Sequence, residues 1–288
     1  MDGGLGLPDG FYDKYCKKIR FAGKTNPAVK RVAALIANTR PNPDRLFVAE
    51  GIWAFNMALS AGLDFVSFFY APECAYSPEA LNLAGRAASA ADYINILSKK
   101  VFLTISERDE PDGLLAVCRL PRSDVKDIPL GNAMVVVLDG LEIPGNIGTI
   151  LRSADASGAD AVLVCGRKAR LTHPKLIKGS MGAAFTVPVV EFPTATECRE
   201  WLLANGFSIF LADTRAEKGF YDYDYHGNCA VVMGGERYGL SREWYGEGAN
   251  LLSIPMLGKC DSLNVAIAAT VILYEMRLKK NNLRQGKV

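Results

Sequence analysis

The chain has 288 residues, of which 49% are hydrophobic and 22% charged, and its net charge is only +2. This composition is typical of a soluble globular protein, and a charge so close to neutral identifies no class of partner. The seven cysteines are scattered and never spaced as Cys-x-x-Cys, which argues against a disulfide framework or a zinc site and favours a reducing cytoplasm. No apolar run approaches the roughly 18 residues of a membrane span, and the first residues lack a secretion signal. We therefore expect a cytoplasmic protein that binds no metal and does not enter a membrane.

The first part of the chain alternates helix and strand patterns. Apolar spacing and stop signals predict a helix that starts at Asn26-Pro27 and two more at 52–61 and 80–96. Short apolar runs predict strands at 46–51, 65–70, 101–103 and 114–118. This alternation predicts a small α/β domain over residues 1–120, and the proline-bounded segment 121–131 is the candidate linker.

Cations cluster near the start of this domain. Between Lys14 and Arg45 lie nine lysines and arginines, these two included, against a single acidic residue, Asp44, with three aromatic residues in or beside the stretch. Such a cluster could contact phosphates. The apolar residues of the predicted helix, however, are also spaced as on a helix with one solvated face. From spacing alone that plainer interpretation is favoured.

The rest of the chain, residues 132–288, is predicted to be a second α/β domain. Strands are expected at 133–138, 161–165, 185–190, 207–212 and 228–233, and helices at 146–157, 197–205 and 262–280. The β-branched run at 133–138 suits a parallel strand buried on both faces, and the last helix is apolar nearly all round. We expect a mostly parallel sheet whose ligand lies at the carboxyl ends of the strands.

Three glycine-containing loops in this second domain carry polar side chains. They are Pro144–Gly148 with Arg152, Met233–Ser241, and Ser253–Val265. Glycine lets a backbone approach a ligand closely, and all three loops follow apolar, strand-like runs. Three such loops in one half of a chain describe a binding site.

Each polar residue of these loops also has a plainer explanation. Asn146, Ser262 and Asn264 lie near the starts of predicted helices, so each could be an N-cap. Glu236 could form a salt bridge with a nearby arginine. Arg152 is harder to explain without a function, because it interrupts an apolar helix face and so indicates a partner or a phosphate.

Other site chemistries find little support. The two histidines, His173 and His226, lie near no nucleophile elbow, phosphate-binding loop or zinc-binding helix, so we interpret both as structural or surface residues. The first glycine loop resembles a dinucleotide-binding loop but supplies only Gly145-x-x-Gly148. No acidic residue closes the following strand, so a nicotinamide dehydrogenase is a weak alternative.

The three loops, in their order and spacing, resemble the three motifs of the SpoU (TrmH-like) branch of the SPOUT RNA methyltransferases. The matching segments are Asn146–Arg152, Met233–Ser241 and Ile254–Val265. Softer cues, at 47–51 and 105–117, are similar to that family's L30e-like N-terminal substrate-binding domain. One position departs from the pattern: Gly235 precedes the motif-two glutamate, where many relatives have a side chain such as asparagine.

The resemblance implies a deep trefoil knot in the second domain, a homodimer that completes the site, and S-adenosylmethionine as cofactor. It implies methylation of a ribose 2'-hydroxyl in RNA, with 23S ribosomal RNA as the expected substrate and transfer RNA as the near alternative. By their motif positions, the cofactor-binding residues would be Leu211, Gly234, Ile254, Met256 and Leu263. The catalytic set would be Asn146, Arg152, Glu236, Ser262 and Asn264.

The role of Arg152 needs chemistry beyond the resemblance. Family accounts often make this arginine the activator of the hydroxyl, but an arginine essentially never loses its proton in a protein. We therefore expect Arg152 to bind the target phosphate and hydroxyl, and a phosphate oxygen or Glu236 to accept the proton. Methyl transfer needs an in-line approach, so such positioning would supply much of the rate.

In a domain that delivers RNA, the N-terminal cations gain a function. The resemblance therefore reverses the interpretation made from spacing: Lys17, Lys18, Arg20, Lys30 and Arg31 are expected to contact RNA, with binding that weakens steeply as salt rises. From another class, a catalytically silent RNA-binding protein with the same fold is the remaining alternative. The intact polar set of the three motifs argues against it.

Overall fold

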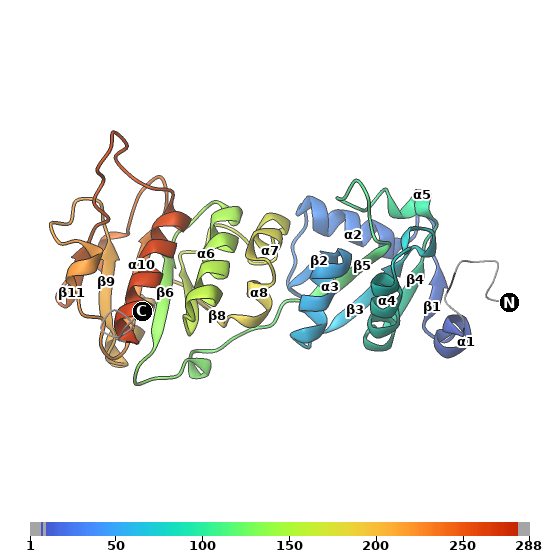
Figure 1. The fold of residues 1–288 in the computed structure, drawn as a ribbon, viewed down its shortest axis with the longest axis horizontal. Helices are drawn as coiled ribbons and strands as arrows, with labels where there is room; N and C mark the ends of the chain where they lie inside the picture. The colour runs from blue at the N-terminus through green and yellow to red at the C-terminus, as the bar shows by residue number, and fades with distance from the viewer. Residues whose placement is uncertain (1–6, 8–9, 282–288) are drawn as a thin grey trace. The chain divides into compact units, whose positions relative to one another are not determined.

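The computed structural model describes all residues except 1–6, 8–9 and 282–288. The chain divides into two compact units, Met1–Pro121 with Thr172–Pro174, and Arg122–Leu171 with Lys175–Val288. Each unit is built around its own β-sheet (Figure 1). Within the described residues, no helix combines the length and the apolar character that crossing a lipid bilayer requires.

The first unit is a five-stranded mixed sheet in the order β1-β4-β3-β5-β2, in which only β5 runs against the others. Its strands are β1 (Ile19–Phe21), β2 (Leu46–Glu50), β3 (Phe65–Tyr70), β4 (Tyr93–Ile96) and β5 (Leu114–Arg119). Its helices are α1 (Phe11–Tyr15), α2 (Pro27–Ala37), α3 (Gly51–Ser60), α4 (Pro78–Ala90) and α5 (Lys99–Phe102), with a 3-10 turn η2 (Pro72–Cys74). The predicted strands at 46–51, 65–70 and 114–118 and the helix at 52–61 are confirmed to within a residue.

Two predictions for this unit are wrong. The helix expected at 80–96 ends at Ala90, and residues 93–96 form β4, because Ala91 turns extended and Asp92 pairs with the backbone of β3. The strand expected at 101–103 is helical, since Ser98 caps α5 by accepting a hydrogen bond from the Val101 N–H. β1 escaped prediction because three residues are too short to show alternation.

The second unit is a six-stranded, wholly parallel sheet in the order β11-β9-β10-β6-β7-β8. Its strands are β6 (Met134–Asp139), β7 (Ala161–Cys165), β8 (Val189–Phe192), β9 (Ser208–Ala212), β10 (Cys229–Gly234) and β11 (Ala249–Leu252). Its helices are α6 (Pro144–Ser157), α7 (Pro174–Ser180), α8 (Ala183–Thr186), α9 (Ala195–Ala204) and α10 (Val265–Lys280), with 3-10 turns η3 (Val125–Asp127), η4 (Phe220–Asp222) and η5 (Arg242–Trp244).

The mostly parallel sheet predicted for this unit is confirmed, and its burial on both faces explains why the run at 133–138 is apolar throughout. Every residue of β6 is buried, because residues of α9 pack on one face of the sheet. Helices α6 and α10 pack together over the other face (Figure 1). The strand expected at 185–190 is partly wrong: residues 183–186 form α8, and β8 starts only at Val189. The short edge strand β11 was not predicted.

The strand order places β6 and β10, which are far apart in the sequence, next to each other in this sheet. From β6 the chain runs outward through β7 to β8, then crosses back to β9 on the far side of β10. β6 and β10 pair along their whole length, so that their last residues, Asp139 and Gly234, are register partners. The loops leaving these two strands diverge, which is the place where parallel sheets bind ligands.

Candidate functional site

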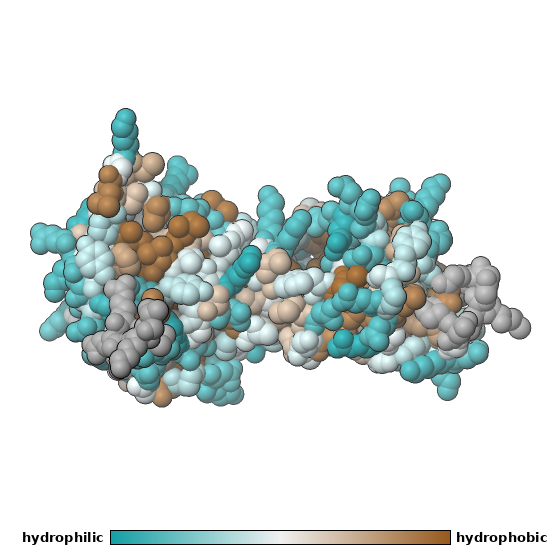
Figure 2. Space-filling view, in the orientation of Figure 1, coloured by the Kyte–Doolittle hydropathy of each residue, from teal (hydrophilic) through white to brown (hydrophobic). Residues whose placement is uncertain are grey.

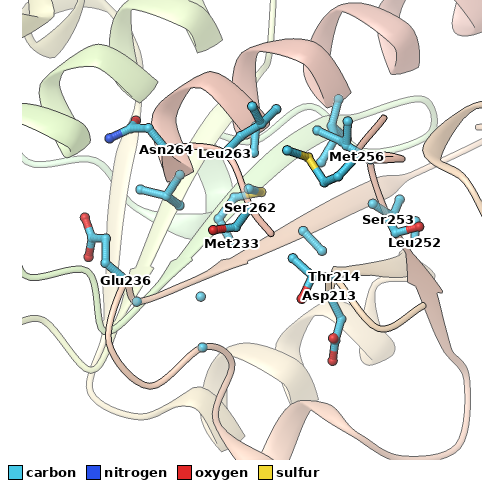
Figure 3. A pocket seen from close by; sticks show the side chains of 18 residues that line it. Asp213, Thr214, Met233, Glu236, Leu252, Ser253, Met256, Ser262, Leu263 and Asn264 are labelled. Carbon is cyan, nitrogen blue, oxygen red and sulfur yellow. The ribbon is translucent and has the colours of Figure 1, made fainter. Parts of the chain in front are cut away.

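A pocket of about 410 Å³ lies at this carboxyl edge, bounded by the ends of β9, β10 and β11 and by the segment that leads into α10 (Figure 3). Most of its lining side chains are apolar. Figure 3 places Glu236 and Asn264 toward one end of the pocket and Asp213 and Thr214 toward the other. This size, with apolar walls and a few convergent polar groups, is that of a small-molecule site.

The residues predicted to bind a cofactor lie in or next to this pocket. Gly234, Ile254, Met256 and Leu263 line it. Leu211 does not, because its fully buried side chain belongs to the core beneath α9; the next residue, Ala212, reaches the pocket.

The loop after β10 is fixed at both ends. A Cβ added to Gly234 would lie 2.4 Å from the carbonyl carbon of Gly239, so the close turn between them needs glycine. At the far end, the buried carboxylate of Asp139 accepts hydrogen bonds from the Ser241 N–H, at 2.6 Å, and from the Ser241 hydroxyl. The loop that carries Glu236 is therefore held against the end of β6.

Asp139 is a site residue that the sequence reasoning missed. The sequence does carry a signal for it, because Asp139 ends an apolar strand just before Gly140. A carboxylate in that position is buried, and a buried charge requires hydrogen-bond or ionic partners. Gly235, the departure from the family pattern, packs against the same place. A Cβ there would lie 3.0 Å from the Gly140 carbonyl oxygen, which leaves little room for a side chain.

Three predicted catalytic residues meet beside the pocket, although they come from three distant segments. The Asn146 amide donates a hydrogen bond to Glu236 Oε1 at 2.5 Å, and the Asn264 amide donates one to Asn146 Oδ1 at 3.3 Å. Helix capping does not explain Asn146, because Ile143 is the N-cap of α6. Capping explains only the side-chain oxygen of Asn264, since Oδ1 accepts a hydrogen bond from the Ala266 N–H at 2.9 Å at the start of α10. The amide N–H that donates to Asn146 has no role in the cap.

Glu236 has capacity left for a ligand. Among the described residues it forms no ion pair with Arg237 or Arg242, and its Oε2 has no hydrogen-bond partner. Arg237 instead lies 5.2 Å from the ring centre of Tyr238. Ser262 also lines the pocket, and its hydroxyl donates to Asp261 at 3.3 Å.

Arg152 lies on α6 six residues after Asn146 and is exposed. Within the part of the chain that the structure describes, its guanidinium has neither an ion pair nor a hydrogen bond. Arg152 therefore presents a guanidinium with available N–H donors beside an apolar helix face. The planar arrangement of these donors is suited to a phosphate or a carboxylate.

The first glycine loop serves helix packing. A Cβ on Gly148 would lie 2.5 Å from the Leu176 carbonyl oxygen and 2.9 Å from the Ser180 nitrogen, both on α7. This contact places the backbones of α6 and α7 against one another at the first turns of α6. It also removes the reason to expect a dinucleotide-binding loop here.

A second polar network closes the opposite end of the pocket. Asp213 follows β9, and its carboxylate accepts hydrogen bonds from Arg215 Nε at 3.0 Å, Arg215 Nη2 at 2.8 Å, the Arg215 N–H at 2.9 Å and the Tyr245 hydroxyl at 2.6 Å. The hydrogen bonds from Arg215, supported by Tyr245, hold the pKa of Asp213 well below its usual range. Burial and the bond to Asp213 raise the pKa of Tyr245. The sequence reasoning did not find this network.

The five N-terminal cations differ in their surroundings. Lys18 is half-buried and donates to the carbonyls of Ala91, at 2.7 Å, and Ser89, at 3.3 Å. Arg20 lies 4.3 Å from the ring centre of Tyr93, and Arg31 forms an exposed ion pair with Asp44 at 3.7 Å. Lys17 and Lys30 are exposed and have no partner among the described residues.

No group of three or more His, Cys, Asp or Glu side chains in the described ranges is arranged to hold a metal ion. Fold and site thus define an α/β protein whose small-molecule pocket lies at the carboxyl ends of neighbouring strands of a parallel sheet, with a second α/β unit on the same chain. Comparison with known families identifies the family to which this chain belongs. The SpoU rRNA Methylase family matches residues 133–274, and the MRM3-like substrate binding domain matches residues 26–116.

Known proteins agree with this assignment. An AdoMet-bound rRNA methyltransferase from Sinorhizobium meliloti superposes with a TM-score of 0.80 at 28% identity, over 90% of this chain and 98% of that one. An RNA 2'-O ribose methyltransferase superposes with a TM-score of 0.75 at 31% identity, over 91% of this chain and 99% of that one. The chain belongs to the SpoU rRNA methylase family, which confirms the resemblance seen in the three motifs.

A curated relative extends the comparison. The 23S rRNA (uridine(2479)-2'-O)-methyltransferase of Streptomyces viridochromogenes is 36% identical over 186 residues, which are 62% of this chain and 65% of that protein. The match thus covers less than two thirds of that relative's own length.

Proposed function

We propose that this chain is an S-adenosylmethionine-dependent methyltransferase that modifies a ribose 2'-hydroxyl in 23S ribosomal RNA. The observation that carries the proposal is the meeting of Asn146, Glu236 and Asn264 at one end of a pocket of small-molecule size. The names of the relatives support it, since one is a 23S rRNA 2'-O-methyltransferase and another was crystallised with AdoMet.

The pocket fits this cofactor by chemistry and size. Ile254, Met256 and Leu263 offer apolar surface suited to an adenine ring, and Gly234 leaves backbone groups accessible. The polar side chains at its two ends, which include the carboxylates of Asp213 and Glu236, suit hydroxyl and amino groups. When bound, S-adenosylmethionine supplies an electrophilic methyl group carried on a sulfonium.

The residues of this chain would then position the ribose and take its proton. Arg152 binds a phosphate next to the target ribose through its free guanidinium. Glu236 accepts the proton of the 2'-hydroxyl on Oε2, while Asn146 fixes Oε1 and Asn264 fixes Asn146. Ser262 orders the loop beside them. Arg152 stays a cation throughout and donates hydrogen bonds only, because an arginine side chain essentially never loses its proton in a protein.

We also propose that residues 1–120 bind the RNA, that 121–131 form a linker, and that 132–288 form the knotted catalytic domain. Lys17, Arg20 and Lys30 are the best candidates to contact phosphates. Lys18 and Arg31 would first have to exchange the partners that they hold in this structure.

A homodimer is the proposed assembly, and the cytoplasm the proposed compartment, where ribosomal RNA is available. In support of a dimer, Figure 2 shows hydrophobic side chains gathered over α10, where Ile267 is 51% exposed and Tyr274 is 44% exposed. Residues seven apart share one helix face, so a second copy could cover both. Gel filtration with light scattering tests this directly, and a monomer at micromolar concentration would reject the dimer.

The deciding experiment is methyl transfer from radiolabelled S-adenosylmethionine to deproteinised ribosomal RNA and, separately, to transfer RNA. One ribosomal site that resists alkaline cleavage supports the proposal, and Arg152→Ala should lose the signal. Label found only in transfer RNA would mean that transfer RNA, and not ribosomal RNA, is the substrate. Failure to bind the cofactor at all, measured by calorimetry, would reject the enzymatic function.

A further inference from the structure

We infer that the end of α7 and the turn that follows it, residues 178–182, form a substrate-positioning element: Met181 contacts the target nucleotide and Lys178 binds a phosphate beside it. This inference rests on the proposed function and extends it to residues outside the three motifs.

The strain lies at Met181. Its φ is +49°, in the left-handed region, and it immediately follows the last residue of α7. Helices often end on such a residue, which is usually glycine because a side chain is unfavourable there. In the described residues the other non-glycine positions with positive φ are Asn38 and Arg45, and asparagine tolerates this conformation. Strained side chains of this kind concentrate at functional sites.

This segment is fixed against α6, the helix that carries Asn146 and Arg152. A Cβ on Gly179 would lie 3.3 Å from the Gly145 carbonyl oxygen, and one on Gly148 would lie 2.9 Å from the Ser180 nitrogen. The end of α7 therefore touches α6 on both sides of Asn146, and Figure 1 shows the two helices side by side. One helical turn rises only about 5.4 Å, so this backbone lies within roughly one turn of Asn146 along α6.

The two side chains suit a nucleotide. Met181 is 41% exposed although it is large and apolar, and its flexible thioether packs well on flat aromatic faces such as a base. Lys178 is exposed and has no partner among the described residues, which leaves its ammonium for a phosphate. The Met181 N–H donates to the Lys178 carbonyl oxygen at 3.3 Å, so both residues belong to one short turn.

The test compares stability with activity in the full-length protein. Met181→Gly removes both the strain and the side chain, so the melting temperature should rise while kcat/KM on ribosomal RNA falls about tenfold, the scale of one lost base contact. Met181→Leu keeps an apolar side chain and should retain most activity. The dissociation constant for S-adenosylmethionine should not change in either variant, because Met181 does not line the cofactor pocket.

Lys178→Ala gives a second, independent readout. The slope of log affinity for RNA against log salt should fall by about one, whereas Lys126→Ala, at an exposed lysine in η3, should leave it unchanged. A Met181→Gly variant that is stabilised but fully active would overturn the role of Met181, and an unchanged slope in Lys178→Ala would overturn that of Lys178. If the wild type methylates no RNA in the same assay, the proposed function fails instead.

Discussion

Two cavities of similar size differ completely in what they offer a ligand. The second unit has the pocket of about 410 Å³ at the end of its parallel sheet, and the N-terminal unit has one of about 440 Å³ lined by residues of η2, α4 and α5 and by the segment before β5. The second cavity is lined by Asp109, Glu110 and Asp112 against a single lysine, Lys99. Such a lining repels RNA phosphates, and Asp112 is already paired with Arg108 at 3.5 Å.

The difference teaches that volume alone does not identify a site. The pocket of the second unit joins apolar walls to a carboxylate oxygen without a hydrogen-bond partner, Glu236 Oε2, in the described structure. It lies at the carboxyl ends of β9, β10 and β11, so loops from distant parts of the sequence converge there. The N-terminal cavity has polar groups but no such convergence. Substitutions matched between the two cavities test whether only the pocket of the second unit is a functional site.

The largest effect is expected at Arg152. Arg152→Ala should lower the rate of methyl transfer by roughly 100- to 1000-fold, the scale of losing one positioned donor. Because the side chain is exposed and has no partner in the described ranges, the melting temperature and cofactor affinity should not change. The matched variant is Lys99→Ala in the second cavity, which should keep full activity. Single-turnover kinetics measure both, and Arg152→Lys with wild-type turnover would refute bidentate positioning.

Glycine substitutions give the next largest effect. A Cβ at Gly234 would lie 2.4 Å from Gly239, and one at Gly113 would lie 2.4 Å from the Ala71 carbonyl oxygen, so both alanine variants force a backbone to move. Overpacking of this kind costs about 1–3 kcal/mol. In Gly234→Ala the shift distorts the pocket, and cofactor affinity should fall about tenfold to a hundredfold. Gly113→Ala should destabilise the N-terminal unit and leave calorimetric cofactor binding unchanged; equal losses would mean that the pocket is not the cofactor site.

The same contrast explains how far the sequence could be interpreted. The strands of the parallel sheet and the polar loops were predictable because each is a local pattern: an apolar run followed by glycine and a polar side chain. Asn146 could be proposed for the same reason. That it bonds to Glu236, 90 residues away, could not, since no local pattern encodes a contact across strands.

What escaped prediction depends on long-range partners or on backbone angles. Asp139 and Asp213 are ordinary carboxylates in the sequence, and only the fold shows that each is buried and fully bonded. Met181 has no sequence signal at all, because its importance lies in a positive φ. Lys18 belongs to a run of cations that looks uniform until its carbonyl partners are known.

A moderate, pH-dependent effect is expected at the far end of the catalytic pocket. The pKa of Asp213 is lowered by the hydrogen bonds from Arg215, so its stabilising contribution is complete above the unfolded value of about 4 and is lost as the pH falls below it. Asp213→Asn should lower the melting temperature by a few degrees at pH 7 and by less at pH 3. Tyr245→Phe removes one hydrogen-bond donor to Asp213, so its melting temperature should lie between those of the wild type and Asp213→Asn. A deficit that is the same at both pH values would show that ionisation of Asp213 does not stabilise the fold.

The smallest effects should separate two lysines of the N-terminal basic cluster. Lys18→Met removes two bonds to backbone carbonyls, at 2.7 and 3.3 Å, and should lower the free energy of unfolding by about 1 kcal/mol with little change in RNA affinity. Lys30→Ala removes an exposed cation without a partner in the described structure, and should weaken RNA binding about threefold with no loss of stability. Chemical denaturation and filter binding at two salt concentrations measure the pair. If both variants weaken RNA binding equally and neither is destabilised, Lys18 leaves its carbonyl partners when RNA binds, and the basic cluster acts as one surface rather than as a mixture of structural and RNA-binding cations.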